Sequence, residues 1–382
     1  MSKTKPVPKP KLSMSLMEFH QMFPDEDSAR GFFETARWPD GVVCLHCGSK
    51  NRSGWLKRWA RWQCNDCFKQ FTVKIGTPME RSHIDLHRWL LGMFLMMSSS
   101  KGISSWKLAE HLGLSYKAAW HMGHRIRAMM GDFGGPLKGV VEIDETYGGA
   151  PPRKKASDVK SRVGGVHNDC DAHNDNTYDT DHDDDDTPPS SGGGSGKGRG
   201  QSPSKFSVPS KVLGERKTGR GTTRPMVLVA MERGGCTMAR PLATHSKGAV
   251  EQALDGVLSK DPDTVVMTDG LPAYKHLGAS HSHHTVTHSA RVFVCHQEGV
   301  GHPILVNTCE SWNGLFKRAL VGVFHQVSPW HLGRCAQESA FRWNTRTQHI
   351  LDRLRVMVQS GFGKTLPFSM LAGRASNTMT AG

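Results

Sequence analysis

Residues 139–149 read GVVEIDETYGG, the pattern of a strand that carries acidic side chains inside a sheet. Successive side chains of a strand point to opposite faces, so Val140, Glu142 and Asp144 are expected on one face. Val141 and Ile143 are expected on the other. Burying a carboxylate costs free energy unless it is paired or binds a metal. Asp144 is therefore a functional candidate, and its strand is expected to open a catalytic sheet.

Later segments extend this strand into an α/β domain. The stretch PMVLVAMER at 225–233 indicates a second strand, and residues 246–258 indicate a helix. The stretch DTVVMTDG at 263–270 indicates a buried strand that ends in Asp269. Sites of open α/β sheets usually form where strands end and loops begin, so Asp269 is the second candidate acid.

The third candidate acid, Glu310, lies in NTCESWNGLFKRALVG at 307–322. Helical spacing predicts one apolar face made of Trp312, Leu315, Phe316, Ala319 and Leu320. Glu310, Gly314 and Lys317 fall on the opposite face. A helix docked by its apolar side would therefore point a carboxylate at the site. Lys317 would lie two turns further along, where it can hold a phosphate.

Asp144, Asp269 and Glu310 together suit a pair of divalent ions. Two ions about 4 Å apart need several carboxylates from different elements, and hard oxygen ligands favour Mg²⁺ or Mn²⁺. One ion would activate the attacking water or 3′-hydroxyl, and the other would stabilise the leaving oxygen. Taken singly, each acid is more often a surface or capping residue. Their order and context favour the catalytic interpretation.

Two CxxC pairs, separated by 16 residues, predict a four-thiolate structural zinc site at Cys44, Cys47, Cys64 and Cys67. The segment between the pairs carries Lys57, Arg58 and Arg61 among three tryptophans, which suits a β-hairpin ribbon with a basic, DNA-binding face. His46 is expected to be exposed and not a ligand. A purely structural ribbon is the alternative.

The stretch SSWKLAEHLGLSYKAAWHMGHRIRAMM at 104–130 has helix-turn-helix spacing. Gly113-Leu114 makes the turn, and Ser115 can cap the second helix. That helix carries the basic residues Lys117, His121, His124, Arg125 and Arg127. It could lie in a major groove with Lys117, Arg125 and Arg127 as DNA contacts. An ordinary helical pair with a solvated basic face is the alternative.

Composition and charge favour a polyanion as partner. The chain has 49 Lys+Arg against 35 Asp+Glu, a net charge of +14. Nucleic acid is therefore the first expectation and an acidic membrane surface the second. The longest apolar run is about nine residues where a membrane span needs roughly 20, and the basic, Pro-rich start is not a secretory signal. The protein is expected inside the cell.

The motif series resembles the zinc-ribbon insertion-sequence transposases of the DDE superfamily, the ISXO2-like group, and their eukaryotic Merlin counterparts. The matching stretches occur in family order over most of residues 15–347: CLHCGS, QCNDCFKQFTVKIGTPME, WKLAEHLGLSYKAAWHMGHRIRAMM, VEIDETYGG, TDG, VNTCESWNGLFKRALVGVFH and FRWNTR.

The resemblance implies an RNase H-like fold with Asp144, Asp269 and Glu310 as the catalytic triad. Lys317 matches the basic residue such enzymes place after the glutamate, and Lys317 and Arg318 are expected to contact DNA. His288-Ser289 resembles a short element preceding the third acid. Arg342 and Asn344 resemble part of the closing helix. Relatives act as multimers, so a homo-oligomer on terminal inverted repeats and target DNA is expected.

The predicted organisation is a multidomain α+β chain. It consists of a disordered basic tail (1–14), a helical lead-in with the zinc ribbon (15–76), a helix-turn-helix region (80–131), an RNase H-like catalytic domain (138–350) with a disordered low-complexity insertion (152–212), and a C-terminal tail (351–382). HSHH at 281–284 is expected in a solvated loop, with metal binding as the alternative.

Two other functions stay open at this stage. One is a domesticated or decayed DNA-binding protein without turnover, and the other is a structure-selective nuclease of the same fold. The expected location is the cytoplasm or nucleoid of a bacterium, or the nucleus of a eukaryote.

Overall fold

The computed structural model describes residues 12–50, 53–131, 134–148, 224–286, 294, 303–325 and 327–371. These residues belong to one compact unit, Met1–Pro152 with Arg224–Gly382. The predicted insertion at 152–212 and the His288-Ser289 element lie outside the described residues. In the described part of the chain, no helix is both long and apolar enough to cross a membrane.

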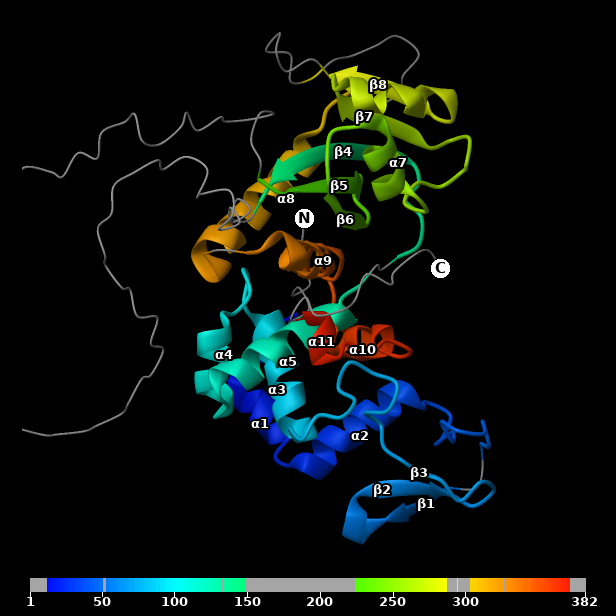
Figure 1. The fold of residues 1–382 in the computed structure, drawn as a ribbon, viewed down its shortest axis with the longest axis vertical. Coiled ribbons are helices and arrows are strands. Elements are labelled where there is room, and N and C mark those ends of the chain that lie inside the picture. Colours follow the sequence, from blue (N-terminus) through cyan, green and yellow to red (C-terminus); the bar gives the residue numbers. More distant parts are fainter. Residues whose placement is uncertain are drawn as a thin grey trace, which may run out of the picture. The chain divides into compact units, whose positions relative to one another are not determined.

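The first sheet is a small antiparallel ribbon of order β1-β2-β3 (Figure 1). Its strands are β1 (Ser53–Leu56), β2 (Arg61–Cys64) and β3 (Gln70–Phe71), and the 3-10 turn η1 (Lys57–Trp59) joins the first two. Trp55 and Trp62 are cross-strand partners with ring centroids 5.3 Å apart. Such aromatic pairs stabilise a hairpin that is too small for an aliphatic core.

Helices α1 (Leu16–Met22), α2 (Glu26–Arg37) and α3 (Leu86–Ser98) pack around one apolar core. The first two begin at capping boxes, Ser15 with Glu18 and Asp25 with Ser28. Helix α3 carries an apolar stripe at helical spacing, and its members are buried: Leu86, Trp89, Leu90, Met93, Phe94 and Met97.

The segment 351–382, predicted as a tail, instead contributes a helix to this same core. Helix α10 (Ile350–Ser360) buries Leu354 and Met357 completely, and the short α11 (Phe368–Leu371) follows. The prediction of a tail is therefore wrong for this helix. Its apolar residues recur at i, i+4 and i+7 from Ile350, a pattern that the sequence already contained.

The two helices predicted at 104–130 are present with the predicted turn and cap. Helix α4 (Ser105–Leu112) ends at Gly113, whose φ of 60° is the left-handed conformation that glycine adopts without strain. Helix α5 (Tyr116–Met129) begins at Ser115, whose side chain accepts a hydrogen bond from the Ala118 backbone N–H.

The second sheet has five strands in the order β6-β5-β4-β7-β8, which Figure 1 shows. The strands are β4 (Val140–Tyr147), β5 (Met226–Glu232), β6 (Thr237–Leu242), β7 (Val265–Asp269) and β8 (Ser282–Val286). The β4–β5 and β5–β6 pairs are antiparallel, whereas β4–β7 and β7–β8 are parallel.

Helices cover both faces of this sheet. Helix α7 (Lys247–Leu254) and the 3-10 segment η3 (Pro272–Ala279) pack on the face that carries Val141 and Ile143. Helices α8 (Asn307–Ala319) and α9 (Pro329–Asn344), joined by the π-helical η5 (Leu320–Phe324), pack on the face that carries Val227 and Val229. The domain is thus a three-layer sandwich.

Candidate functional site

The first two candidate acids lie on neighbouring parallel strands. In the β4–β7 register Ile143 pairs with Thr268, and one further step sets Asp144 beside Asp269. Neighbouring strands run about 4.8 Å apart, so the two residues leave the sheet at the same corner. Both are half-buried. Asp144 Oδ1 accepts a hydrogen bond from the Glu145 backbone N–H at 2.9 Å.

Helix α8 is fixed on this face by Glu142, a fully buried carboxylate on β4. Its Oε2 accepts hydrogen bonds from the backbone N–H groups of Thr308 at 2.8 Å and Cys309 at 3.3 Å. Its Oε1 accepts from Arg233 Nε at 2.7 Å. The first N–H groups of a helix lack intrahelical partners. The N-cap residue here is Val306, whose side chain has no atom that could accept a hydrogen bond from them. Glu142, which lies on β4, therefore caps the start of helix α8.

Glu310 lies in the first turn of the anchored α8. One turn beyond Glu310, Asn313 Nδ2 donates to Asp144 Oδ2 at 2.8 Å. Burial raises the pKa of the intervening Cys309 thiol, and Asp144, Glu142 and Glu310 raise it further, so all three carboxylates act on one sulfur atom. Glu310 itself is exposed. Glu142 and Asn313 were not predicted as site residues.

The two faces predicted for α8 are largely confirmed. Trp312 and Phe316 are buried with stacked rings 5.1 Å apart, and Lys317 is exposed. Gly314 leaves the helix surface open, since a Cβ there would meet nothing within 4 Å. Leu315 departs from the pattern because it is 44% exposed.

A fourth carboxylate, Glu145, stands on the other side of β4 from Asp144. Burial raises its pKa to about 7, and the nearby Asp269 and Asp144 add to the shift. Burial likewise raises the pKa of the Tyr274 hydroxyl, which lies close to Glu145. The corner thus concentrates negative charge that a cation would neutralise.

The donor set of this corner fits hard divalent ions. It offers carboxylates from β4, β7 and α8, and two buried oxygens, Glu145 Oε1 and Asn313 Oδ1, have no hydrogen-bond partner within the described residues. No three of these acids have ligand atoms within 4.8 Å of one another. A two-ion site tolerates this, because ions about 4 Å apart with bonds near 2.1 Å span roughly 8 Å.

We expect Glu142→Gln to lower the free energy of unfolding by about 3 kcal/mol, because it leaves the Arg233 guanidinium without its buried partner. Urea titration measures the change. The exposed Glu251 on α7 gives a matched control, and Glu251→Gln should cost less than about 0.5 kcal/mol. Equal midpoints for the two variants would contradict the anchoring role of Glu142.

The four cysteines form the predicted metal centre. Their sulfur atoms all lie within 4.8 Å of one another, and the Cys44–Cys67 and Cys47–Cys64 pairs are each 3.6 Å apart. A tetrahedral zinc ion with bonds of about 2.3 Å sets its sulfurs roughly 3.8 Å apart. His46 Nε2 lies 3.3 Å from the Gln70 carbonyl oxygen, and His46 is outside the thiolate cluster, as predicted.

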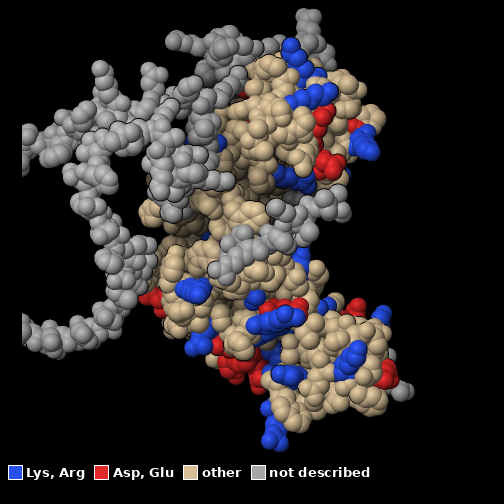
Figure 2. All heavy atoms as spheres, viewed as in Figure 1, with Lys and Arg blue, Asp and Glu red and all other residues tan. Residues whose placement is uncertain are grey.

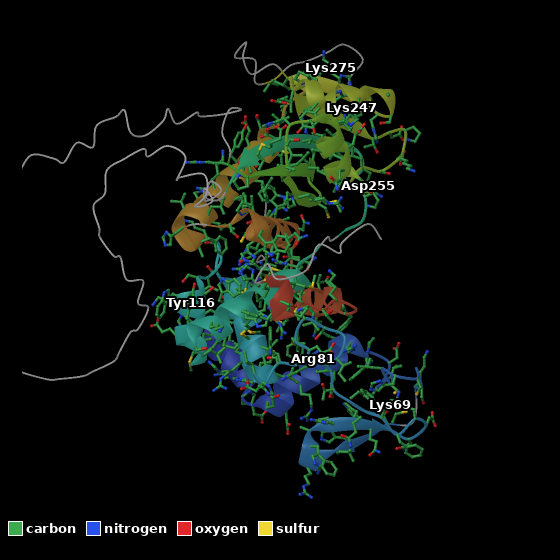
Figure 3. All side chains as sticks on the ribbon, viewed as in Figure 1. Lys69, Arg81, Tyr116, Lys247, Asp255 and Lys275 are labelled. Atoms are coloured by element: carbon green, nitrogen blue, oxygen red, sulfur yellow. The ribbon has the colours of Figure 1, made fainter. Side chains whose placement is uncertain are left out.

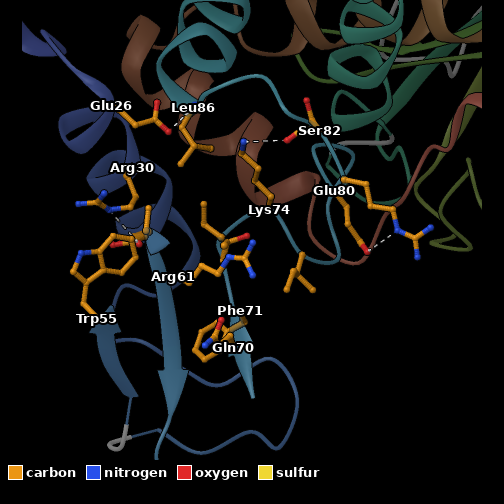
Figure 4. A pocket seen from close by; sticks show the side chains of 16 residues that line it. Glu26, Arg30, Trp55, Arg61, Gln70, Phe71, Lys74, Glu80, Ser82 and Leu86 are labelled. Atoms are coloured by element: carbon orange, nitrogen blue, oxygen red, sulfur yellow. Dashed lines mark hydrogen bonds and ion pairs between the residues drawn. The ribbon is translucent and has the colours of Figure 1, made fainter. Parts of the chain in front are cut away.

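The ribbon docks on α2 across a pocket of about 400 Å³ (Figure 4). The Arg30 guanidinium lies 4.1 Å from the centroid of the Trp55 ring. Glu34 accepts a hydrogen bond from Trp62 Nε1 at 2.7 Å, and Lys74 Nζ donates to the Ile84 carbonyl at 2.6 Å. These charged side chains of the pocket already have partners within the protein. The pocket therefore belongs to the interface that holds the ribbon on α2.

The predicted DNA contacts divide into exposed and buried residues. The exposed ones are Lys57, Arg58, Arg61, Lys117, Lys317 and Arg318. On the face drawn in Figure 2, Lys and Arg lie over the ribbon and neighbouring helices among acidic side chains. Arg125 and Arg127 are buried. The prediction that these two contact DNA is therefore corrected.

Arg125 and Arg127 instead connect α5 to later parts of the chain. Arg125 donates to the backbone carbonyls of Leu366 and Glu80. Arg127 Nε lies 2.6 Å from Glu338 Oε2 on α9, where both side chains are almost fully buried. Arg342 also donates to Glu338. This cluster joins the helical region to the large sheet domain through a charge pair.

Asn344, at the end of α9, holds the edge of the large sheet. Its Oδ1 accepts from the Thr237 backbone N–H at 2.7 Å and its Nδ2 donates to the Thr237 carbonyl at 2.9 Å. Asn344 of the FRWNTR motif therefore fixes α9 to the edge strand β6. The HSHH stretch, expected in a loop, largely forms β8, where His283 Nε2 lies 2.8 Å from Thr268 Oγ1.

We expect Glu338→Ala to lower the free energy of unfolding by about 3–5 kcal/mol, since Arg127 would stay buried without its partner. Burial alone raises the pKa of Glu338, but Arg127 and Arg342 bring it below the usual value. The folded pKa lies below the unfolded one, so this stabilisation is present at neutral pH and is lost as pH falls through the folded pKa. Urea titrations at neutral and acid pH measure both effects.

The matched control for Glu338→Ala is Asp352→Ala, which removes an exposed partner of Arg355 on α10. We expect that control to cost less than about 1 kcal/mol. A Glu338→Ala variant as stable as the control at neutral pH would contradict the account of the buried pair.

Comparison with known proteins finds similarity to transposases in two parts of the chain. Residues 203–344 match the family model described as the ISXO2-like transposase domain, and residues 24–70 match the transposase zinc-ribbon domain. A protein of Halobacterium salinarum described as an uncharacterized protein in transposable element ISH50 is 26% identical over 304 residues, which cover 78% of this chain and 84% of that protein. No solved structure matches.

Together, the fold and these matches define a zinc-ribbon protein with a transposase domain. The resemblance to the insertion-sequence transposases of the ISXO2-like group is confirmed.

Proposed function

We propose that the chain is a DNA transposase that cuts at the terminal inverted repeats of its element and joins the freed 3′ ends to target DNA. One observation carries the proposal: β4 and β7 bring Asp144 and Asp269 to one corner, and Glu142 and Asn313 dock against it α8, the helix that carries Glu310. Three acids from three elements suit in-line displacement at phosphorus.

We also propose that the large sheet is an RNase H-like fold. Three antiparallel strands (β6, β5, β4) continue into two parallel strands (β7, β8), and helices pack on both faces. The first strand of the domain lies in the centre of this order and carries the first acid. The arrangement supports the assignment that the motif order suggested.

Asp144, Asp269 and Glu310 would hold two Mg²⁺ or Mn²⁺ ions, which would supply activation of the attacking oxygen and stabilisation of the leaving oxygen. The protein itself positions the DNA. Lys317 lies two turns beyond Glu310 on the exposed side of α8 and would hold a backbone phosphate. Gly314, between them, leaves room for the DNA backbone.

The upstream modules would grip the DNA. The exposed Lys57, Arg58 and Arg61 give the ribbon a basic surface. The pair α4–α5 would act as a helix-turn-helix through the first turn of α5, where Lys117 is exposed. Cutting both ends of an element together would require at least two copies of the chain, so we propose that it works as an oligomer.

Incubating the protein with the element's end DNA, a target plasmid and Mg²⁺ tests the proposal. The end DNA can be found as inverted repeats that flank the gene. We expect nicked ends and joined products, both abolished when Mg²⁺ is omitted from the reaction of the zinc-loaded protein. Cleavage without joining would favour a structure-selective nuclease, and binding without cleavage would favour a decayed DNA-binding protein.

A further inference from the structure

Large aromatic side chains stand in solvent around the start of α5. Trp106 is 73% exposed, Tyr116 48%, Trp330 58% and Phe368 44%. Exposed tryptophans and phenylalanines that cluster on a folded protein usually mark an interaction surface. These four come from α4, α5, α9 and α11, so the fold brings them together from distant parts of the sequence.

Three contacts, together with neighbours in the sequence, connect the four rings and one lysine. The Trp106 and Tyr116 ring centroids are 5.5 Å apart, and Figure 3 labels Tyr116 beside α4 and α5. The next residue, Lys117, has its Nζ 5.8 Å from the Phe368 ring. Trp330 Nε1 donates to the carbonyl of Met370, two residues after Phe368. We call these five residues the aromatic strip.

Only the first part of α5 is exposed enough to contact DNA. Beyond Trp120 its residues are largely buried, including both Arg125 and Arg127. The strip contains a lysine and no carboxylate, which complements a polyanion, and the chain carries a net charge of +14. Nucleic acid fits this surface better than an apolar protein face would.

The chemistry of the strip favours base faces over base edges. A duplex groove presents edges that are recognised by hydrogen-bond donors and acceptors. Phe368 has neither, and the only donor of the Trp330 ring is already bonded to Met370. Exposed ring faces beside a cation are instead typical of proteins that stack unpaired bases and neutralise the adjoining phosphates.

We propose that the aromatic strip binds unpaired bases of the DNA end, with Trp106 and Tyr116 as stacking platforms and Lys117 on a neighbouring phosphate. This inference rests on the proposed function, because staggered strand cleavage at an element end leaves unpaired terminal bases. It assigns a binding surface for single-stranded DNA on the α4–α5 pair itself, whose Lys117 would also contact phosphates of the duplex.

Fluorescence anisotropy with two DNA probes tests the proposal. One probe is a blunt duplex of the element end, and the other is the same duplex with a single-stranded overhang of a few bases. We expect Trp106→Ala and Tyr116→Ala each to weaken binding of the overhang probe roughly 10-fold and binding of the blunt probe less than about 2-fold. Lys117→Ala should weaken both and reduce the salt slope by about one.

The matched control is Met17→Ala, which shortens another exposed apolar side chain, on α1, and should change neither affinity. Circular dichroism verifies that each variant is folded. The strip proposal is overturned if Trp106→Ala and Tyr116→Ala affect both probes equally or affect neither. It is also overturned if these two variants leave DNA binding unchanged but alter the molecular mass of the protein in analytical ultracentrifugation. In that case a second copy of the chain would cover the strip.

The outcomes also separate this proposal from the proposed function. If the wild-type protein binds both probes and the variants keep its preference for the overhang, only the strip proposal fails. If the wild-type protein binds neither probe, DNA recognition fails and the strip proposal falls with it.

Discussion

Asp269→Asn is expected to reduce strand cleavage and joining by at least about 1,000-fold while end-DNA binding stays within about 2-fold. The substitution replaces one carboxylate oxygen by an amide nitrogen, which cannot hold a cation. Divalent ions contribute several kcal/mol to the stabilisation of the transition state, and each 1.4 kcal/mol is a factor of ten in rate. Gel assays of cleavage and joining with Mg²⁺ measure the loss, and anisotropy measures binding.

The matched control is Asp263→Asn, six residues earlier, in the exposed turn before β7. It removes the same charge outside the site and should leave turnover within about 2-fold. If Asp269→Asn still cuts DNA at a similar rate, the metal assignment is wrong. If both Asp269→Asn and Asp263→Asn lose DNA binding, the substitutions disturb the fold, and the loss of turnover in Asp269→Asn is then not evidence for a metal ligand.

Removal of zinc is expected to unfold the ribbon. Binding of structural zinc by such small modules supplies roughly 10–16 kcal/mol, which the short strands β1, β2 and β3 cannot replace. Cys64→Ser removes a fully buried ligand and should have the same effect as a chelator. Trp55 and Trp62 pack against each other in the ribbon, so tryptophan fluorescence reports its loss.

Cys236→Ser is the control for this experiment, because Cys236 is half-buried and lies outside the thiolate cluster. We expect one zinc ion per chain in the wild type and in Cys236→Ser, and a strongly reduced zinc content in Cys64→Ser. A ribbon that keeps its fluorescence and protease resistance in excess chelator would contradict the structural role of the metal.

Local patterns in the sequence predicted much of the fold. The alternation in 139–149 correctly placed Glu142 and Asp144 on the face opposite Val141 and Ile143. The CxxC pairs predicted the thiolate cluster, because metal-ligand spacing is a local property. Ser115 and Gly113 predicted the start of α5 and the end of α4 for the same reason.

These local patterns could not predict contacts between residues that are far apart in the sequence. Glu142 caps a helix through Thr308, which lies 166 positions later, and nothing near Glu142 in the sequence indicates that partner. Arg127 has the spacing of a solvated basic face, yet its partner Glu338 lies 211 positions away. Helical periodicity defines the faces of α5 but does not say which face another helix will cover.

A crystal structure of the protein bound to its end DNA in Mn²⁺, with an anomalous map at the manganese edge, tests the central claim most directly. The account predicts two manganese peaks about 4 Å apart, in contact with Asp144, Asp269 and Glu310. Manganese bound elsewhere, or Glu310 turned away from ions held by the two strand acids, would contradict it.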